Sequence, residues 1–108
     1  MPVATIVQQW FNARFGGSLF LPDGWYGRPY DNQHMLTSID ENGDDLSMTL
    51  DNRLTLHFKG LQAVTPTARE LIFGPFAKLR FEWDSVEGGH RQTKEYDNGE
   101  VRIVLAPG

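Results

Sequence analysis

The stretch that decides the fold is residues 45–58, with the sequence DLSMTLDNRLTLHF. On both sides of the polar segment 51–53, every second residue is apolar. The apolar positions are Leu46, Met48 and Leu50 before this segment and Leu54, Leu56 and Phe58 after it. A period of two is typical of a β-strand that turns one face to the core and the other to water. The stretch is therefore predicted to form two strands.

The same pattern predicts how these two strands pair. A two-residue turn at 52–53 would place Leu50 against Thr55 and mix apolar with polar faces. A three-residue loop, 51–53, keeps the apolar faces together. In that register the pairs are Leu50–Leu54, Met48–Leu56 and Leu46–Phe58. We predict this hairpin, with a single long bulged strand as the alternative, because the alternation keeps its phase across the loop.

A second hairpin is predicted immediately upstream. Residues 35–40 and 45–50 flank Asn42-Gly43, a dipeptide that strongly favours a two-residue hairpin turn. With these two residues as the loop, Ile39 lies opposite Leu46. The remaining pairs of this register are Thr37–Met48 and Met35–Leu50.

The C-terminal part of the chain continues the strand pattern. Residues 61–65 and 69–73 are predicted to be short strands, and Gly74-Pro75 a turn or a bend. Residues 77–83 alternate apolar with charged side chains, as a strand does when one face is buried and the other solvated.

A last hairpin is predicted to join residues 91–96 to 101–105 through Asn98-Gly99. This register places Tyr96 beside Val101. It also places Glu95 beside Arg102, as a cross-strand ion pair. The polar stretch 91–95 is typical of a sheet edge that charge protects from further pairing.

Residues 3–15 have the period of an amphipathic helix instead. Pro2 suits the first helical position, and Gly16-Gly17 can supply the left-handed residue that often ends a helix. The apolar face consists of Val3, Ile6, Val7, Trp10 and Phe11.

These patterns together predict an α+β, β-rich fold. The N-terminal helix packs on a curved antiparallel meander of about seven strands, which is either an open sheet or a partly closed barrel. The strands are expected between about residues 18 and 105. Because the chain contains no linker or internal repeat, residues 1–108 are predicted to be a single domain.

Composition restricts the classes of function and location. The chain has 108 residues, a net charge of −4 and no cysteine. Acidity argues against a nucleic-acid partner, which needs a concentrated basic face. Without an apolar run long enough for a membrane span or the pattern of a signal peptide, no membrane partner is expected. The absence of cysteine favours a reducing compartment, so we expect a cytoplasmic location.

The segment 25–34, WYGRPYDNQH, is the most unusual in composition. Its candidate binding residues are Trp25, Tyr26, Arg28, Tyr30, Asp31 and His34. Aromatic rings and guanidinium groups are enriched in binding patches. Arg28 could clamp an anion, and Asp31 could orient His34 as a base. In the alternative interpretation, the rings fold back over the sheet and the segment is a surface turn.

No catalytic residue, metal site or cofactor is predicted. The histidines at 34, 57 and 90 lack ligand spacing, and no serine lies in a G-x-S-x-G elbow. We therefore expect a small non-enzymatic interaction module that acts through a protein partner or through self-association. The alternative is a small-molecule binding protein or minor enzyme that uses the segment 25–34. A third hypothesis is a domain with a purely structural role.

Overall fold

The computed structural model describes residues 2–13, 16–26, 33–84 and 91–105. The elements in this part of the chain are α1 (Val3–Asn12), β1 (Ser18–Leu21), β2 (Gly24–Trp25), β3 (Leu36–Asn42), β4 (Asp45–Leu50), β5 (Leu54–Lys59), β6 (Val64–Pro66), β7 (Glu70–Phe73), β8 (Lys78–Asp84), β9 (Arg91–Asp97) and β10 (Val101–Val104).

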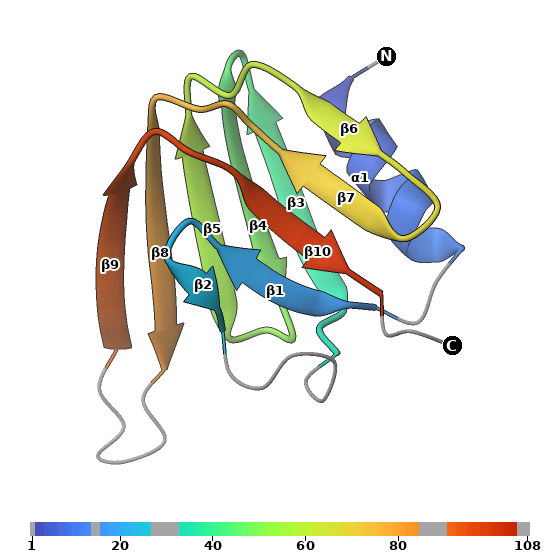
Figure 1. Cartoon of the computed structure of the whole chain (residues 1–108), viewed down its shortest axis with the longest axis horizontal. Helices are drawn as coiled ribbons and strands as arrows, with labels where there is room; N and C mark the ends of the chain where they lie inside the picture. Colours follow the sequence, from blue (N-terminus) through green and yellow to red (C-terminus); the bar gives the residue numbers. More distant parts are fainter. Residues whose placement is uncertain (1, 14–15, 27–32, 85–90, 106–108) are drawn as a thin grey trace.

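The strands form two antiparallel sheets that lie one over the other (Figure 1). The first sheet has the order β2-β1-β10-β7-β6, and the second has the order β3-β4-β5-β8-β9. The α+β class and the antiparallel pairing are confirmed. The expected single meander is replaced by two open sheets, which do not close into a barrel. A chain with this much alternating apolar sequence can bury it by packing two sheets against each other as well as by curling one.

The predicted pairing of β4 with β5 is confirmed. Leu50 lies opposite Leu54, and the pairs Met48–Leu56 and Leu46–Phe58 follow in register. The loop contains two residues with positive φ, Asp51 at 56° and Asn52 at 55°. Asp and Asn tolerate this left-handed conformation better than other residues with a side chain. The alternative of one long strand is therefore wrong.

The predicted register of β3 with β4 is wrong by two residues. Asn42 pairs with Asp45, so the loop is Gly43-Asp44, and Ile39 lies opposite Met48 instead of Leu46. Gly43 has a φ of 64°, and a hairpin turn of type II′ gives glycine this first central position. Registers that differ by two residues put the same side chains in the core, so the alternation of the strands could not distinguish them.

The predicted hairpin of 91–96 with 101–105 is wrong. β9 pairs with β8 in the second sheet, whereas β10 lies between β1 and β7 in the first. The chain crosses from one sheet to the other at Asn98-Gly99, where both residues have positive φ. The expected ion pair of Glu95 with Arg102 is therefore absent. β9 does lie at the edge of its sheet, as its charged sequence predicted.

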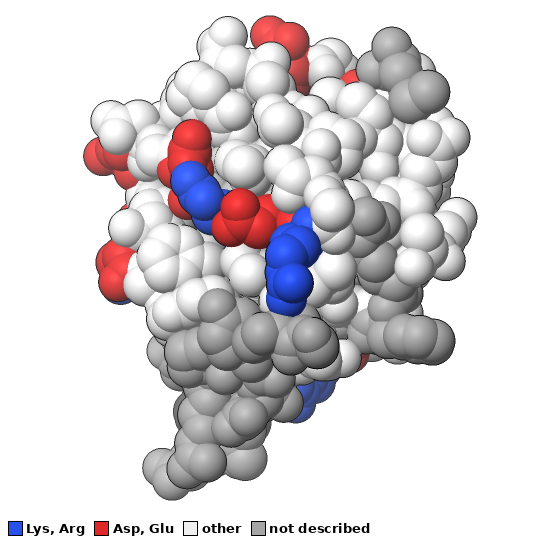
Figure 2. All heavy atoms as spheres, turned by 45° about the vertical axis from the view of Figure 1, so that its right-hand side comes forward, with Lys and Arg blue, Asp and Glu red and all other residues white. Residues whose placement is uncertain are grey.

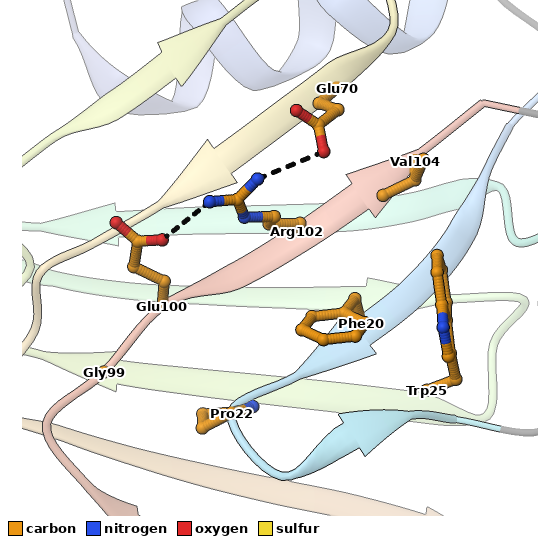
Figure 3. A pocket seen from close by; sticks show the side chains of 8 residues that line it. All are labelled: Phe20, Pro22, Trp25, Glu70, Gly99, Glu100, Arg102 and Val104. Atoms are coloured by element: carbon orange, nitrogen blue, oxygen red, sulfur yellow. Dashed lines mark hydrogen bonds and ion pairs between the residues drawn. The ribbon is translucent and has the colours of Figure 1, made fainter.

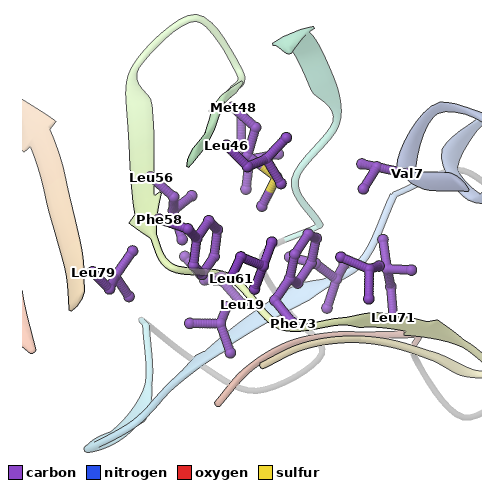
Figure 4. Packing of buried hydrophobic residues seen from close by; sticks show 14 of the residues in the cluster. Val7, Leu19, Leu46, Met48, Leu56, Phe58, Leu61, Leu71, Phe73 and Leu79 are labelled. Atoms are coloured by element: carbon purple, nitrogen blue, oxygen red, sulfur yellow. The ribbon is translucent and has the colours of Figure 1, made fainter. Parts of the chain in front are cut away.

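The core lies between the two sheets (Figure 4). Phe58 of the second sheet stacks on Phe73 of the first, with ring centroids 5.3 Å apart and an interplanar angle of 8°. Both rings are fully buried. Large apolar side chains of this kind supply most of the free energy that holds a small fold together, through the apolar surface they remove from water.

Helix α1 covers one side of this core and contacts the edge strands β3 and β6. Its predicted apolar face is confirmed, since Val7, Trp10 and Phe11 are buried. The Trp10 indole donates to the carbonyl of Thr67 at 2.9 Å, and the Glu41 carboxylate accepts from the Ala4 amide at 2.9 Å. The helix ends at Asn12, earlier than the predicted residue 15, and its C-cap is Ala13 instead of a glycine.

A polar cluster links the two sheets at a second place, away from helix α1. Asp23, in the β1–β2 turn, accepts from the Lys94 ammonium and from the Tyr96 hydroxyl of β9. The turn belongs to the first sheet and β9 to the second. The hydrogen bond from Lys94 lowers the pKa of Asp23 below the usual carboxyl range. Burial and the bond to Asp23 raise the pKa of Tyr96.

Replacement of Phe73 by alanine should lower the free energy of unfolding by about 3–5 kcal/mol, because it leaves a cavity opposite Phe58. The neighbouring Ile72 points away from the core, so Ile72→Ala should cost about 1 kcal/mol. Denaturant unfolding measures both. Equal losses at the two positions would contradict the assignment of inner and outer faces.

Asp23→Asn should destabilise the protein at neutral pH, and this destabilisation should shrink as the pH falls below about 4. The pKa of Asp23 is lower in the folded state, so its stabilising effect is present above about pH 4 and disappears as the pH falls through the folded-state pKa. Urea unfolding of both proteins across this range tests the prediction. The substitution should matter less in a Lys94→Ala background, and a pH-independent difference would be evidence against the cluster.

Candidate functional site

The structure separates the predicted binding residues of the segment 25–34. Trp25 lies on the outer face of the first sheet, whereas Tyr26 and His34 face the interior. Arg28, Tyr30 and Asp31 lie outside the described residues, so their roles stay predictions. Trp25 and Tyr26 diverge because successive residues of an extended chain point to opposite sides.

A row of side chains crosses the outer face of the first sheet and includes Trp25. Strand pairing places them side by side in the order Trp25, Phe20, Arg102, Ile72 and Thr65. Phe20 and Trp25 meet edge to face with ring centroids 4.9 Å apart. All members of this row except Thr65 are half-buried. We call it the outer row.

The outer row borders a shallow hollow of about 480 Å³ (Figure 3). Apolar surface comes from Phe20, Trp25 and Val104 on one side of it. On the other side, the Arg102 guanidinium bridges two carboxylates, Glu70 at 3.3 Å and Glu100 at 3.2 Å. These hydrogen bonds, to Glu100 first and Glu70 second, raise the pKa of Arg102, so the guanidinium stays charged.

The hollow therefore combines aromatic surface with a small excess of negative charge. Two carboxylates and one guanidinium leave a net charge of −1 at neutral pH. Figure 2 shows a short row of alternating acidic and basic side chains set in a largely uncharged surface. An arrangement of this kind can accept a cation and, beside it, an apolar group.

The outer face of the second sheet has a different character. Its strands turn mainly hydroxyl, imidazole and charged side chains to solvent, as at Ser47, Thr49, His57, Arg80 and Glu82. Half-buried aromatic rings mark only the first sheet among the outer faces of the described strands. Of the two outer faces, the one that carries the outer row is therefore the stronger candidate for a binding site, because exposed aromatic surface is a common feature of binding sites.

His34 has a structural partner that the sequence did not predict. Its Nδ1 lies 2.6 Å from Oδ2 of Asp51, and Oδ1 of Asp51 accepts from the Met35 amide. Asp51 thus contacts the imidazole, whereas Asp31, the partner suggested by the sequence, lies outside the described residues. The Nε2 atom of His34 is buried, and none of the described residues forms a hydrogen bond with it. The arrangement connects the β4–β5 loop to the chain that enters β3, and it offers solvent no reactive atom.

Tyr26 packs against the core next to His34 and Asp51. Its ring contacts Phe81 edge to face at 5.3 Å and lies 5.8 Å from the ring of His34. Burial raises the pKa of its hydroxyl. Tyr26 and His34 therefore match the alternative interpretation of this segment, in which its rings cover the sheet.

The sequence did not identify Phe20, Glu70, Glu100 or Arg102 as parts of a site. Phe20 carried a usable signal, because it alternates with the apolar Leu19 and Leu21 and must face away from them. The charged residues carried none. Glu70 and Arg102 are neighbours only because β10 lies beside β7, and the predicted last hairpin placed β10 elsewhere.

Among the described residues, no group of three histidine, cysteine or carboxylate side chains lies close enough together to hold a metal ion. Nor does the described part of the chain contain a helix of the length and apolar character that a bilayer crossing requires. No protein-family model, curated protein or solved structure matches this chain significantly. Its function has to be inferred from its own geometry.

Asp51→Gly should lower the free energy of unfolding by about 2–3 kcal/mol, because it removes the partner of Nδ1 of the buried His34 and of the Met35 amide. Glycine tolerates the positive φ of this position, so the loss reports the carboxylate and not the backbone. Asp51→Asn should cost less, since an amide oxygen can still accept. Denaturant unfolding measures both, and equal losses would exclude the hydrogen bond to His34 as the cause.

Proposed function

We propose that this protein is an interaction module whose outer row and adjoining hollow bind a segment of a partner protein. The segment carries a lysine or arginine next to an apolar side chain. The observation that supports this most is the edge-to-face pair of Phe20 and Trp25, half-buried on an outer sheet face beside two carboxylates.

The aromatic pair favours an apolar group of the partner. Rigid rings bury a large area on binding and lose little conformational entropy, which is why they dominate the energetics of interfaces. Val104 and Ile72 extend this apolar surface across the first sheet. A hollow of about 480 Å³ is large enough for one or two side chains.

The charges favour a basic residue of the partner. Arg102 is held between Glu70 and Glu100, so an incoming cation meets carboxylate oxygens while the guanidinium keeps them in place. A cation over the Trp25 ring would gain further from the cation–π attraction. The overall charge of −4 steers basic partners toward the protein.

The charges disfavour a second copy of the chain as the occupant. A two-fold axis through the outer row would bring the two Arg102 side chains together and set Glu70 against Glu100. Like charges placed opposite each other across an interface cost several kcal/mol. About an axis at Arg102, the order Glu100, Arg102, Glu70 is thus not complementary to itself. An axis between Arg102 and Glu70 would pair these two residues reciprocally, and the ultracentrifugation experiment tests that arrangement.

Selection of displayed random peptides on the wild-type protein tests the proposal. The enriched peptides should share a lysine or arginine beside an apolar residue. Trp25→Ala should weaken binding of a selected peptide by about tenfold or more, as for a central interface aromatic. Glu100→Gln should weaken it less and reduce its dependence on salt. Isothermal titration calorimetry gives both values.

Thr49→Ala, on the outer face of the second sheet, is the matched control and should leave affinity unchanged. Enrichment of acidic peptides, or binding that tolerates Trp25→Ala, would disprove the proposal. Analytical ultracentrifugation addresses self-association. A wild-type dimer that dissociates in Trp25→Ala would assign the outer row to a second copy, against the charge argument.

A further inference from the structure

The second sheet carries a hydrogen-bonded chain of three side chains on its outer face. Ser47 Oγ lies 2.8 Å from Nδ1 of His57, and Nε2 of His57 lies 2.9 Å from Oε2 of Glu82. The three residues come from β4, β5 and β8, which are adjacent in the sheet. Ser47 and His57 are direct cross-strand partners.

The carboxylate decides which nitrogen of His57 carries the proton. An ionised carboxylate can only accept, so Nε2 must be the protonated nitrogen of a neutral imidazole. Nδ1 then has a free lone pair, and the hydroxyl of Ser47 must donate to it. A serine that donates to an imidazole held by a carboxylate is the arrangement by which a hydroxyl becomes a nucleophile.

Space for a reactant lies next to these atoms. A hollow of about 400 Å³ is lined by Ser47 and His57, by the cationic side chains Lys59, Lys78 and Arg80, and by the carboxylates Asp45 and Glu95. The backbone around Ser47 is engaged in sheet pairing on both sides, to β3 and to β5. Negative charge that develops on a substrate oxygen must therefore be stabilised by cationic side chains and not by backbone amides. Lys59 is the main candidate, because Lys78 already pairs with Glu95 at 3.2 Å and Arg80 with Glu82 at 3.8 Å.

We infer that Ser47 is an activated nucleophile for small activated esters, with His57 as its base and Glu82 as the residue that positions His57. Oγ attacks the acyl carbon while its proton passes to Nδ1. The bond to the alcohol then breaks, and His57 returns the proton to the departing oxygen. A water molecule then attacks the acyl carbon of the acyl-serine while its proton passes to Nδ1. The bond from this carbon to Oγ breaks, His57 returns the proton to Oγ, and the acid is released. This site lies on the opposite sheet from the outer row and is independent of it.

A fluorophosphonate probe tests the inference directly, because it reacts with activated serines and not with lysines. Oγ forms a bond to phosphorus, fluoride leaves, and the proton passes to His57. Peptide mapping by mass spectrometry should locate the adduct on Ser47. Ser38, an exposed serine on β3, is the internal control and should stay unmodified. Absence of the adduct on Ser47 after prolonged incubation would overturn the inference.

His57→Ala should slow adduct formation at Ser47 by about 100-fold or more, the usual range for loss of a general base. Thr49→Ala, two residues along the same face, should leave the rate unchanged. Thermal unfolding of each variant verifies that it is folded. An equal rate in the wild type and His57→Ala would show that Ser47 is an ordinary serine.

The positioning role of Glu82 has a separate readout. In ¹⁵N spectra of the neutral imidazole, Nε2 of His57 should be protonated and Nδ1 unprotonated in the wild type. Glu82→Gln can donate to Nε2, so the second tautomer should become populated and the labelling rate should fall by about tenfold or more. A wild-type spectrum with Nδ1 protonated would exclude activation of Ser47.

Discussion

The contact between the inner faces of the two sheets is the constraint on which the rest of the structure depends. It is centred on the stacked rings of Phe58 and Phe73, one from each sheet. Because strand side chains alternate, burying one face of every strand leaves the other face of both sheets for solvent or a partner. Helix α1 and the Asp23–Lys94–Tyr96 cluster connect the sheets at two different places and limit how they can move relative to each other.

The side chains that do not face the core give the outer faces of the two sheets different chemical properties. On the first sheet these are Phe20, Trp25 and Arg102, which combine aromatic area with a guanidinium held by two carboxylates. On the second they include Ser47 and His57, part of a polar hydrogen-bonded chain. The binding proposal and the inferred nucleophile therefore belong to opposite sides of the protein. Each depends on pairing between strands that the core arrangement imposes.

The candidate site was only partly predictable. The unusual composition of segment 25–34 led to Trp25, but its neighbour Tyr26 and the more distant His34 turn inward. Asp51 holds His34, and Asp31, which the sequence suggested for this role, lies outside the described residues. The cross-strand contact of Ser47 with His57 was already implicit in the correct β4–β5 register. The sequence could not predict that Glu82 contacts His57, because no local pattern showed that β8 lies beside β5.

The sequence by itself determined the strand period from residue 18 onward, the buried face of the N-terminal helix and the register around the loop 51–53, because these depend on neighbours within about ten residues. Only the tertiary structure decided that the strands divide between two sheets. It also decided that the chain crosses between them at Asn98-Gly99 and that Arg102 meets Glu70. Alternation specifies which face of a strand is buried but not which strand lies beside it, so a choice between partners far apart in the chain rests on how the whole apolar surface packs.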